Sequence, residues 1–260
     1  MQIFLKIYVQ KAKAYCKHFK KKYSLNTFYS FFVKKQNALK PLQPLVLCIA
    51  ALLMHITASA HPVINYAMEQ APPNEVFWYY LKMGILHIIP EGFDHILFVT
   101  SLCLLSNKIK TILWQATAFT VAHSVTLALS MKNIIVAPSP VVEPIIALSI
   151  VFVAIENILL SELKPWRIAI VFLFGLVHGL GFASALNNVG LPRNQFFTSV
   201  ISFNVGVEIG QITIILLVFG LIIIPFGKYK NFKRNIVYPL SILIALIAGY
   251  WTVQRIGLIQ

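Results

Sequence analysis

The sequence has few charged residues and few cysteines for its length. Charged residues make up 12% of the 260 residues and hydrophobic residues 58%, whereas soluble domains carry about 25% charged residues. This shortage excludes a disordered chain and an ordinary cytosolic enzyme. The three cysteines, Cys16, Cys48 and Cys103, are too few for a disulfide scaffold. The composition is that of a membrane protein.

Acidic residues are the scarcest charged group. Eight Asp and Glu stand against 22 Lys and Arg, which gives a formal net charge of +14. Residues 1–40 hold ten lysines and no acid, whereas residues 61–260 hold twelve basic and eight acidic residues, a difference of +4. A strongly basic balance alone would indicate nucleic acid or anionic lipid as a partner. Because most of the excess lies in the first forty residues, we predict a lipid bilayer and no nucleic acid as partner.

The uncharged stretch 41–60 has the features of a signal peptide. Its apolar part, Leu45–Ile56, has the length of a signal-peptide core and is shorter than the roughly 20 residues of a membrane span. Ala58-Ser59-Ala60 fits a cleavage site, so we predict cleavage before His61. The basic segment before it is either a real extension or the result of a start codon placed too far upstream. The predicted organisation is a leader with signal peptide over 1–60, a short external segment over 61–76 and a transmembrane domain over 77–260.

Six apolar stretches follow the leader and predict an all-α, polytopic helical bundle. Each is long enough, or nearly so, for a span of about 20 residues, and a helix satisfies its own backbone groups in lipid. The stretches are 77–106, 111–131, 142–160, 166–187, 196–225 and 236–257. The first contains Pro90-Glu91-Gly92, which predicts a break in the helix there.

The distribution of basic residues predicts the orientation. With the mature N-terminus outside, the loops near 107–110, 161–167 and 226–235 lie inside and carry eight of the twelve basic residues that follow the leader. Inside loops of membrane proteins are enriched in Lys and Arg. The predicted location is therefore the cytoplasmic (inner) membrane, with several spans and the mature N-terminus outside.

Ionisable residues inside the predicted spans are the main indication of function. Each costs about 2.5–3.5 kcal/mol at the centre of a helix on insertion scales. Eight in one small bundle require mutual pairing, a bound ion or a water-filled cavity. They are His87, Glu91, Asp94, His95, His123, Glu156, His178 and Glu208.

The spacing of these residues suggests shared surfaces. His87 and Asp94 are seven residues apart, nearly two turns, so they share a face if the helix continues through the break. Asn204, Glu208 and Gln211 are spaced by four and three residues and lie on one face of the fifth span. Structural interpretations stay open, because a single intramembrane histidine is often only a packed, hydrogen-bonded residue.

Imidazole and carboxylate ligands together favour a divalent transition metal. They suit Ni²⁺, Co²⁺, Zn²⁺ or Fe²⁺ better than Mg²⁺ or Ca²⁺, which prefer oxygen. The predicted metal ligands are His87, Asp94, His95, His123, His178 and Glu208. Further candidates are His61, Glu91, Glu156, Asn204 and Gln211. The ligand types do not rank nickel above zinc.

Four motifs resemble those of the HupE/UreJ family of bacterial membrane proteins. They are GILHIIPEGFDHILFV, FTVAHSVTLALS, FGLVHGLGFASAL and FNVGVEIGQ, in this order along the chain. The resemblance implies a secondary nickel or cobalt permease with a cleaved signal peptide, linked to hydrogenase or urease maturation. By resemblance, His87, Asp94 and His95 match the family's first-span motif. His123, His178 and Glu208 match its other intramembrane polar positions.

Three functions are compatible with these residues. In the first, Ni²⁺ or Co²⁺ passes from His61 to the helix break and then inward. No tightly bound cofactor is expected, and without a Walker motif ATP is not the direct drive. In the second, three histidines and Asp94 hold Zn²⁺ in an intramembrane hydrolase, which requires ligands that converge. In the third, the polar residues only pack the bundle of an accessory subunit.

Overall fold

The computed structural model describes residues 68–160, 162–189 and 191–257. All of them belong to one unit of the chain, which runs from Ala58 to Gln260. The predicted leader, the cleavage site before His61 and the start of the predicted external segment lie outside the described residues.

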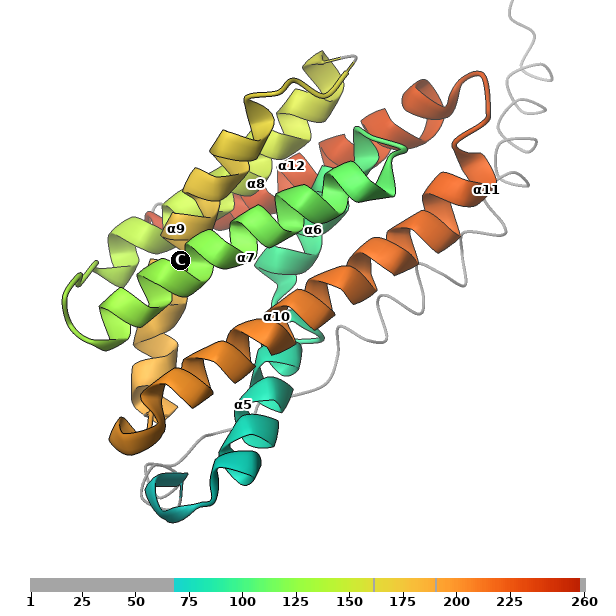
Figure 1. Ribbon diagram of the computed structural model, residues 1–260. Coiled ribbons are helices and arrows are strands. Elements are labelled where there is room, and N and C mark those ends of the chain that lie inside the picture. Colours follow the sequence, from blue (N-terminus) through green and yellow to red (C-terminus); the bar gives the residue numbers. More distant parts are fainter. Residues whose placement is uncertain (1–67, 161, 190, 258–260) are drawn as a thin grey trace, which may run out of the picture. The chain divides into compact units, whose positions relative to one another are not determined.

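The described residues fold into helices and contain no strand, which confirms the all-α prediction (Figure 1). Short 3₁₀ or π turns lie at η2 (Arg193–Gln195), η3 (Phe219–Ile223) and η4 (Lys233–Val237). All six predicted apolar stretches are largely helical. The α-helices are α5 (Pro73–Ile88), α6 (Phe93–Leu104), α7 (Ile109–Met131), α8 (Ser139–Leu159), α9 (Arg167–Val189), α10 (Phe196–Val218), α11 (Ile224–Phe226) and α12 (Tyr238–Arg255).

Four helical segments are long and apolar enough to cross a membrane. They are Ile109–Met131, Ser139–Leu159, Arg193–Phe226 and Lys233–Arg255. The bent pair α5 and α6 makes a fifth if it counts as one span, and α9 contributes a shorter apolar helix over Arg167–Ala183. Large apolar side chains on these helices are exposed, among them Leu148, Leu217 and Leu246, as expected for surfaces that face lipid.

The first predicted span is broken where the sequence indicates. α5 ends at Ile88, α6 begins at Phe93, and the two helices are bent by 67°. Pro90 lacks the backbone N–H that a continuous helix would need, and the Ile89–Pro90 peptide bond is cis. His87 therefore lies at the end of one helix and His95 in the first turns of the next.

The helices pack in pairs that bring distant parts of the chain together. α7 runs along α9, α10 runs along α5, and α12 runs along α8 (Figure 1). Glycines permit the closest approaches: a Cβ on Gly206 of α10 would overlap the Leu81 carbonyl of α5. Likewise a Cβ on Gly179 of α9 would overlap the His123 carbonyl of α7. Small residues at such contacts let helix backbones meet in membranes.

Candidate metal site

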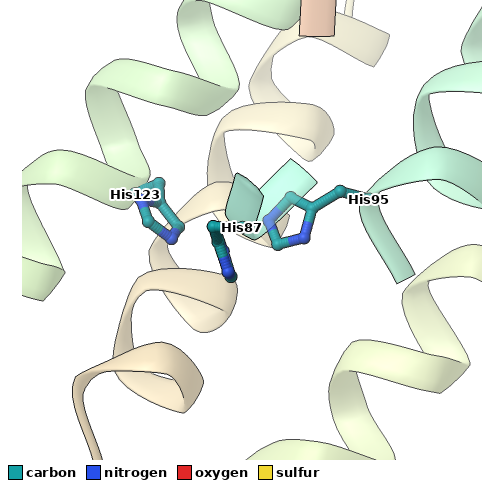
Figure 2. A group of neighbouring side chains, drawn as sticks. All are labelled: His87, His95 and His123. Atoms are coloured by element: carbon teal, nitrogen blue, oxygen red, sulfur yellow. The ribbon is translucent and has the colours of Figure 1, made fainter. Parts of the chain in front are cut away.

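Four histidines from four helices lie together in the bundle. His87 comes from α5, His95 from α6, His123 from α7 and His178 from α9. We call them the histidine cluster. Ring centroids are 4.7 Å apart for His87 and His95 and 5.3 Å apart for His95 and His178. One ring nitrogen from each of His87, His95 and His123 lies within 4.8 Å of the other two, and Figure 2 shows these three rings close together.

The cluster presents unsatisfied nitrogen atoms. In all four residues Nε2 is buried and has no hydrogen-bond partner among the described residues. Buried polar atoms in folded proteins nearly always have a partner. Four such atoms in one place therefore indicate a site for a ligand that accepts nitrogen lone pairs. A divalent metal ion is such a ligand.

The backbone of α9 fixes the state of the His178 ring. Nδ1 of His178 donates a hydrogen bond to the Phe174 carbonyl oxygen over 2.8 Å. Since a carbonyl only accepts, the proton lies on Nδ1 and the neutral ring keeps its lone pair on Nε2. This is the state in which histidine binds a metal.

Asn204 of α10 does the same for His123. The Asn204 amide nitrogen donates to the Val200 carbonyl over 2.8 Å, so its Oδ1 is left as an acceptor. His123 Nδ1 lies 3.3 Å from this oxygen and is therefore the donor, which again leaves Nε2 free. Asn204, a predicted candidate ligand, thus lies behind His123 and orients its ring, as the second partner of a metal-binding histidine does.

Phenylalanine rings surround the histidine cluster. The Phe182 centroid is 3.7 Å from that of His87, and the Phe119 centroid is 4.8 Å from that of His178. Phe98 and Phe203 lie against His178 and His87 at 5.5 and 5.6 Å. This apolar wall restricts water and leaves few polar groups close to the imidazoles.

The structure places Asp94 apart from the cluster. Its carboxylate accepts two hydrogen bonds from one Arg255 nitrogen, at 2.9 and 3.2 Å. The prediction that Asp94 and His87 share a face required a continuous helix, and the 67° bend removes that condition. Asp94 faces α12 instead.

Glu208 also lies outside the cluster, one turn along α10 from Asn204. Its Oε1 accepts a hydrogen bond from the Thr117 hydroxyl over 2.7 Å, and its Oε2 is buried without a partner among the described residues. Both residues line a groove of about 380 Å³ between α7 and α10. Thr120, Ser124 and Asn204 also line this groove, and the rest of its lining is apolar.

The remaining predicted candidates have other surroundings. Glu91 is exposed in the break between α5 and α6. Gln211 is fully buried, and its Oε1 lies 3.4 Å from the Thr120 hydroxyl. His61 lies outside the described residues. Neither Glu91 nor Gln211 joins the histidine cluster.

Glu156 belongs to a buried polar network at the other end of α6. It lies 3.1 Å from Arg167, and the two side chains are only 5% and 2% exposed. The guanidinium N–H is not aligned with the carboxylate oxygen, so this is an ion pair by distance without a well-directed hydrogen bond. Asn157 accepts from Arg167 at 3.4 Å and donates to the Ser101 carbonyl at 2.8 Å. The network therefore joins α6, α8 and α9.

A sequence model of the HupE/UreJ protein family matches residues 64–255. The chain belongs to the HupE/UreJ family. The match covers the whole histidine cluster and both ion pairs. No curated protein and no solved structure matches the chain.

For this HupE/UreJ member, sequence reasoning missed the partners of the acids. Arg255 is 161 positions from Asp94 in the chain. No local spacing in the sequence therefore links the two residues. Arg167 was predicted as an inside loop cation, whereas it is buried beside Glu156. The sequence could indicate these partners in one general way: an acid buried in a membrane needs a counter-charge.

Proposed function

We propose that this protein is a secondary transporter of a divalent transition metal, Ni²⁺ or Co²⁺, across the bacterial cytoplasmic membrane. The observation that carries the proposal is the convergence of ring nitrogens from His87, His95 and His123 within 4.8 Å. The His178 ring lies against His95, and Nε2 of all four histidines is buried without a partner among the described residues. The association of the HupE/UreJ family with nickel and cobalt supports the choice of metal.

The type of ligand suits transport. Imidazole nitrogens bind Ni²⁺, Co²⁺ and Zn²⁺ well and Mg²⁺ or Ca²⁺ poorly. The acids Asp94 and Glu208 hold other partners in this structure, at Arg255 and Thr117. A site of neutral donors without a directly coordinated carboxylate binds a dication less firmly than a mixed site does, and a transporter must release its substrate.

The position of the site also favours a transporter. Secondary transporters commonly bind substrate near the bilayer midplane, at helices that are interrupted there. The histidine cluster meets this description, because His87 and His95 flank the break between α5 and α6. A membrane potential contributes about 2.3 kcal/mol per charge per 100 mV, so it would draw a dication inward with about twice that free energy.

In this proposal the metal ion passes from the histidine cluster to Glu208. Asn204 contacts His123, and Glu208 lies one helical turn further along α10 in the groove between α7 and α10. With the predicted orientation, this direction leads toward the cytoplasm. The groove therefore offers an exit route from the cluster, in which Glu208 supplies a carboxylate that attracts the departing ion.

Uptake of radiolabelled Ni²⁺ and Co²⁺ into cells tests the proposal. We expect His95→Ala to abolish uptake, because it removes a nitrogen from the centre of the cluster. Thr213→Ala is the matched control, since its hydroxyl bonds only its own helix, at Ile209. Uptake by His95→Ala and His123→Ala at the wild-type level, with equal protein in the membrane, would exclude this function and favour an accessory role.

A zinc hydrolase remains the second candidate because three histidines converge. Three protein ligands with an open position are typical of catalytic zinc. A hydrolase also needs a base for the attacking water, and both acids near these helices are engaged elsewhere. Metal analysis of purified, washed protein separates the two functions: one retained zinc ion per chain would favour the hydrolase, and loss of the metal would favour the transporter.

A further inference from the structure

Asp94 and Arg255 form an ion pair at the start of α6, the helix that carries His95. Asp94 precedes His95 in the chain, and its carboxylate lies 2.9 Å from the Arg255 guanidinium. The side chains are 25% and 23% exposed, so the pair is not locked into the core as Glu156 and Arg167 are.

A dication bound by the histidine cluster needs a compensating negative charge. The four imidazoles are neutral donors, so a bound dication would bring its full charge into an apolar environment. Uncompensated charge in a low-dielectric site is strongly unfavourable. Asp94 is the anion next to the cluster along the chain, and in this structure Arg255 neutralises it.

Arg255 is placed so that it can leave Asp94 without unpacking the bundle. It is the last residue of α12, and Gly257 just beyond it adopts a positive φ of 80°. Its guanidinium also donates to the Glu143 carbonyl at 3.2 Å and lies 5.6 Å from the Trp251 ring. These two contacts can hold the side chain after the carboxylate has turned away.

We propose that Arg255 is a competing counter-ion for Asp94 that a dication in the histidine cluster displaces. In the metal-free protein Arg255 holds Asp94. When the metal binds, Asp94 turns toward the cluster and balances its charge, and Arg255 withdraws to Glu143 and Trp251. When the metal leaves, Arg255 recaptures Asp94 and so favours release. The inference rests on the proposed metal transport and adds the residue that sets affinity and release.

Ni²⁺ binding to the full purified protein in detergent, measured by titration calorimetry, tests this inference. We expect Arg255→Gln to bind Ni²⁺ on the order of tenfold more tightly, within the usual range of coupling between two sites, because Asp94 is then free. Asp94→Asn should bind more weakly than wild type. Arg255→Lys, which keeps the charge, should stay near wild type.

The double variant Asp94→Asn/Arg255→Gln decides the mechanism. It leaves neither charge unpaired, so it is expected to fold even if a single variant does not. If Arg255 acts through Asp94, removing Arg255 should change affinity little in the Asp94→Asn background. Arg193→Gln is the charge-matched control, since Arg193 lies in η2 and lines a different pocket.

The possible failures are distinct. Equal Ni²⁺ affinity in wild type and Arg255→Gln would overturn the counter-ion role while leaving metal binding intact. A tightening of the same size in the Asp94→Asn background, or in Arg193→Gln, would also overturn it, because the effect would then be general repulsion. Absence of Ni²⁺ and Co²⁺ binding in wild type would instead contradict the proposed function itself.

Discussion

At the scale of single residues, the two ring nitrogens of His123 differ in their contacts, and so do those of His178. Nδ1 is held by Asn204 in one case and by the Phe174 carbonyl in the other, which leaves both Nε2 atoms available. The sequence singled out these histidines because of their cost inside a membrane, and the structure brings the four rings together. The sequence did not reveal which atoms face the site, because that depends on partners from α10 and from the preceding turn of α9.

The role of Asn204 leads to the first prediction. Asn204→Ala should lower metal affinity by about 10–100-fold, the usual effect of losing a second partner of a ligand, because His123 loses the acceptor that orients it. Gln211→Ala on the same face of α10 is the control, since Gln211 contacts Thr120 and no histidine. Titration calorimetry with Ni²⁺ measures both. Equal losses in the two variants would mean that Asn204 has no special role.

At the scale of elements, the approach of α9 to α7 brings His178 to the cluster. Besides the close contact at Gly179, the Thr126 hydroxyl donates to the Leu176 carbonyl across the two helices over 2.7 Å. Glycines in a membrane helix, such as Gly175, Gly179 and Gly181 of this segment, favour close helix contacts, but the sequence does not name the partner helix, since α7 and α9 are separated by α8.

The Gly179 contact gives the second prediction. Gly179→Ala should destabilise the protein by about 1–3 kcal/mol, as overpacked sites do, and should weaken metal binding, because the new Cβ pushes α9 away from His123. Gly249→Ala in α12 is the matched control, since its Cβ would meet nothing within 4 Å. Thermal unfolding in detergent compares them. A Gly179→Ala variant as stable as Gly249→Ala would contradict the close contact.

The ion pair between α8 and α9 gives the third prediction. Arg167→Ala leaves Glu156 buried and unpaired, so it should destabilise the protein by about 3–5 kcal/mol. The double variant Arg167→Met/Glu156→Leu should recover most of this loss, because no buried charge remains. Unfolding in detergent checks both. A destabilised double variant would show that the pair has a function beyond mutual neutralisation.

At the scale of the whole molecule, the described helices hold the histidine cluster and two ion pairs, Asp94–Arg255 and Glu156–Arg167. The Asp94–Arg255 pair lies at the start of α6, and Asn157, which contacts Arg167 of the other pair, binds Ser101 near the end of α6. The positions of the spans, the broken helix and the four histidines followed from composition, Pro90 and the cost of polar residues in lipid. The pairing of the acids did not: Arg255 is 161 positions from Asp94, and Arg167 pairs with Glu156 of the preceding helix only because α8 and α9 pack together.

The helix break shows where sequence reasoning reaches its limit. Pro90 predicted that α5 and α6 are separate helices, a local property of the backbone. The angle of 67° depends on packing against other helices, and it decides that His95 faces His87 while Asp94 faces Arg255. The motif that predicts three ligands in the sequence therefore gives two clustered histidines and one ion-paired aspartate in the structure.

The central claim is that the four histidines form one metal site, and X-ray absorption of the Ni²⁺- or Co²⁺-loaded protein tests it most directly. We predict one bound ion per chain whose spectrum shows at least three imidazole nitrogens at about 2.0–2.1 Å, the distance of histidine ligands to zinc. The imidazole signal should fall in His123→Ala. A shell made of oxygen alone, or a spectrum that His123→Ala leaves unchanged, would contradict the account.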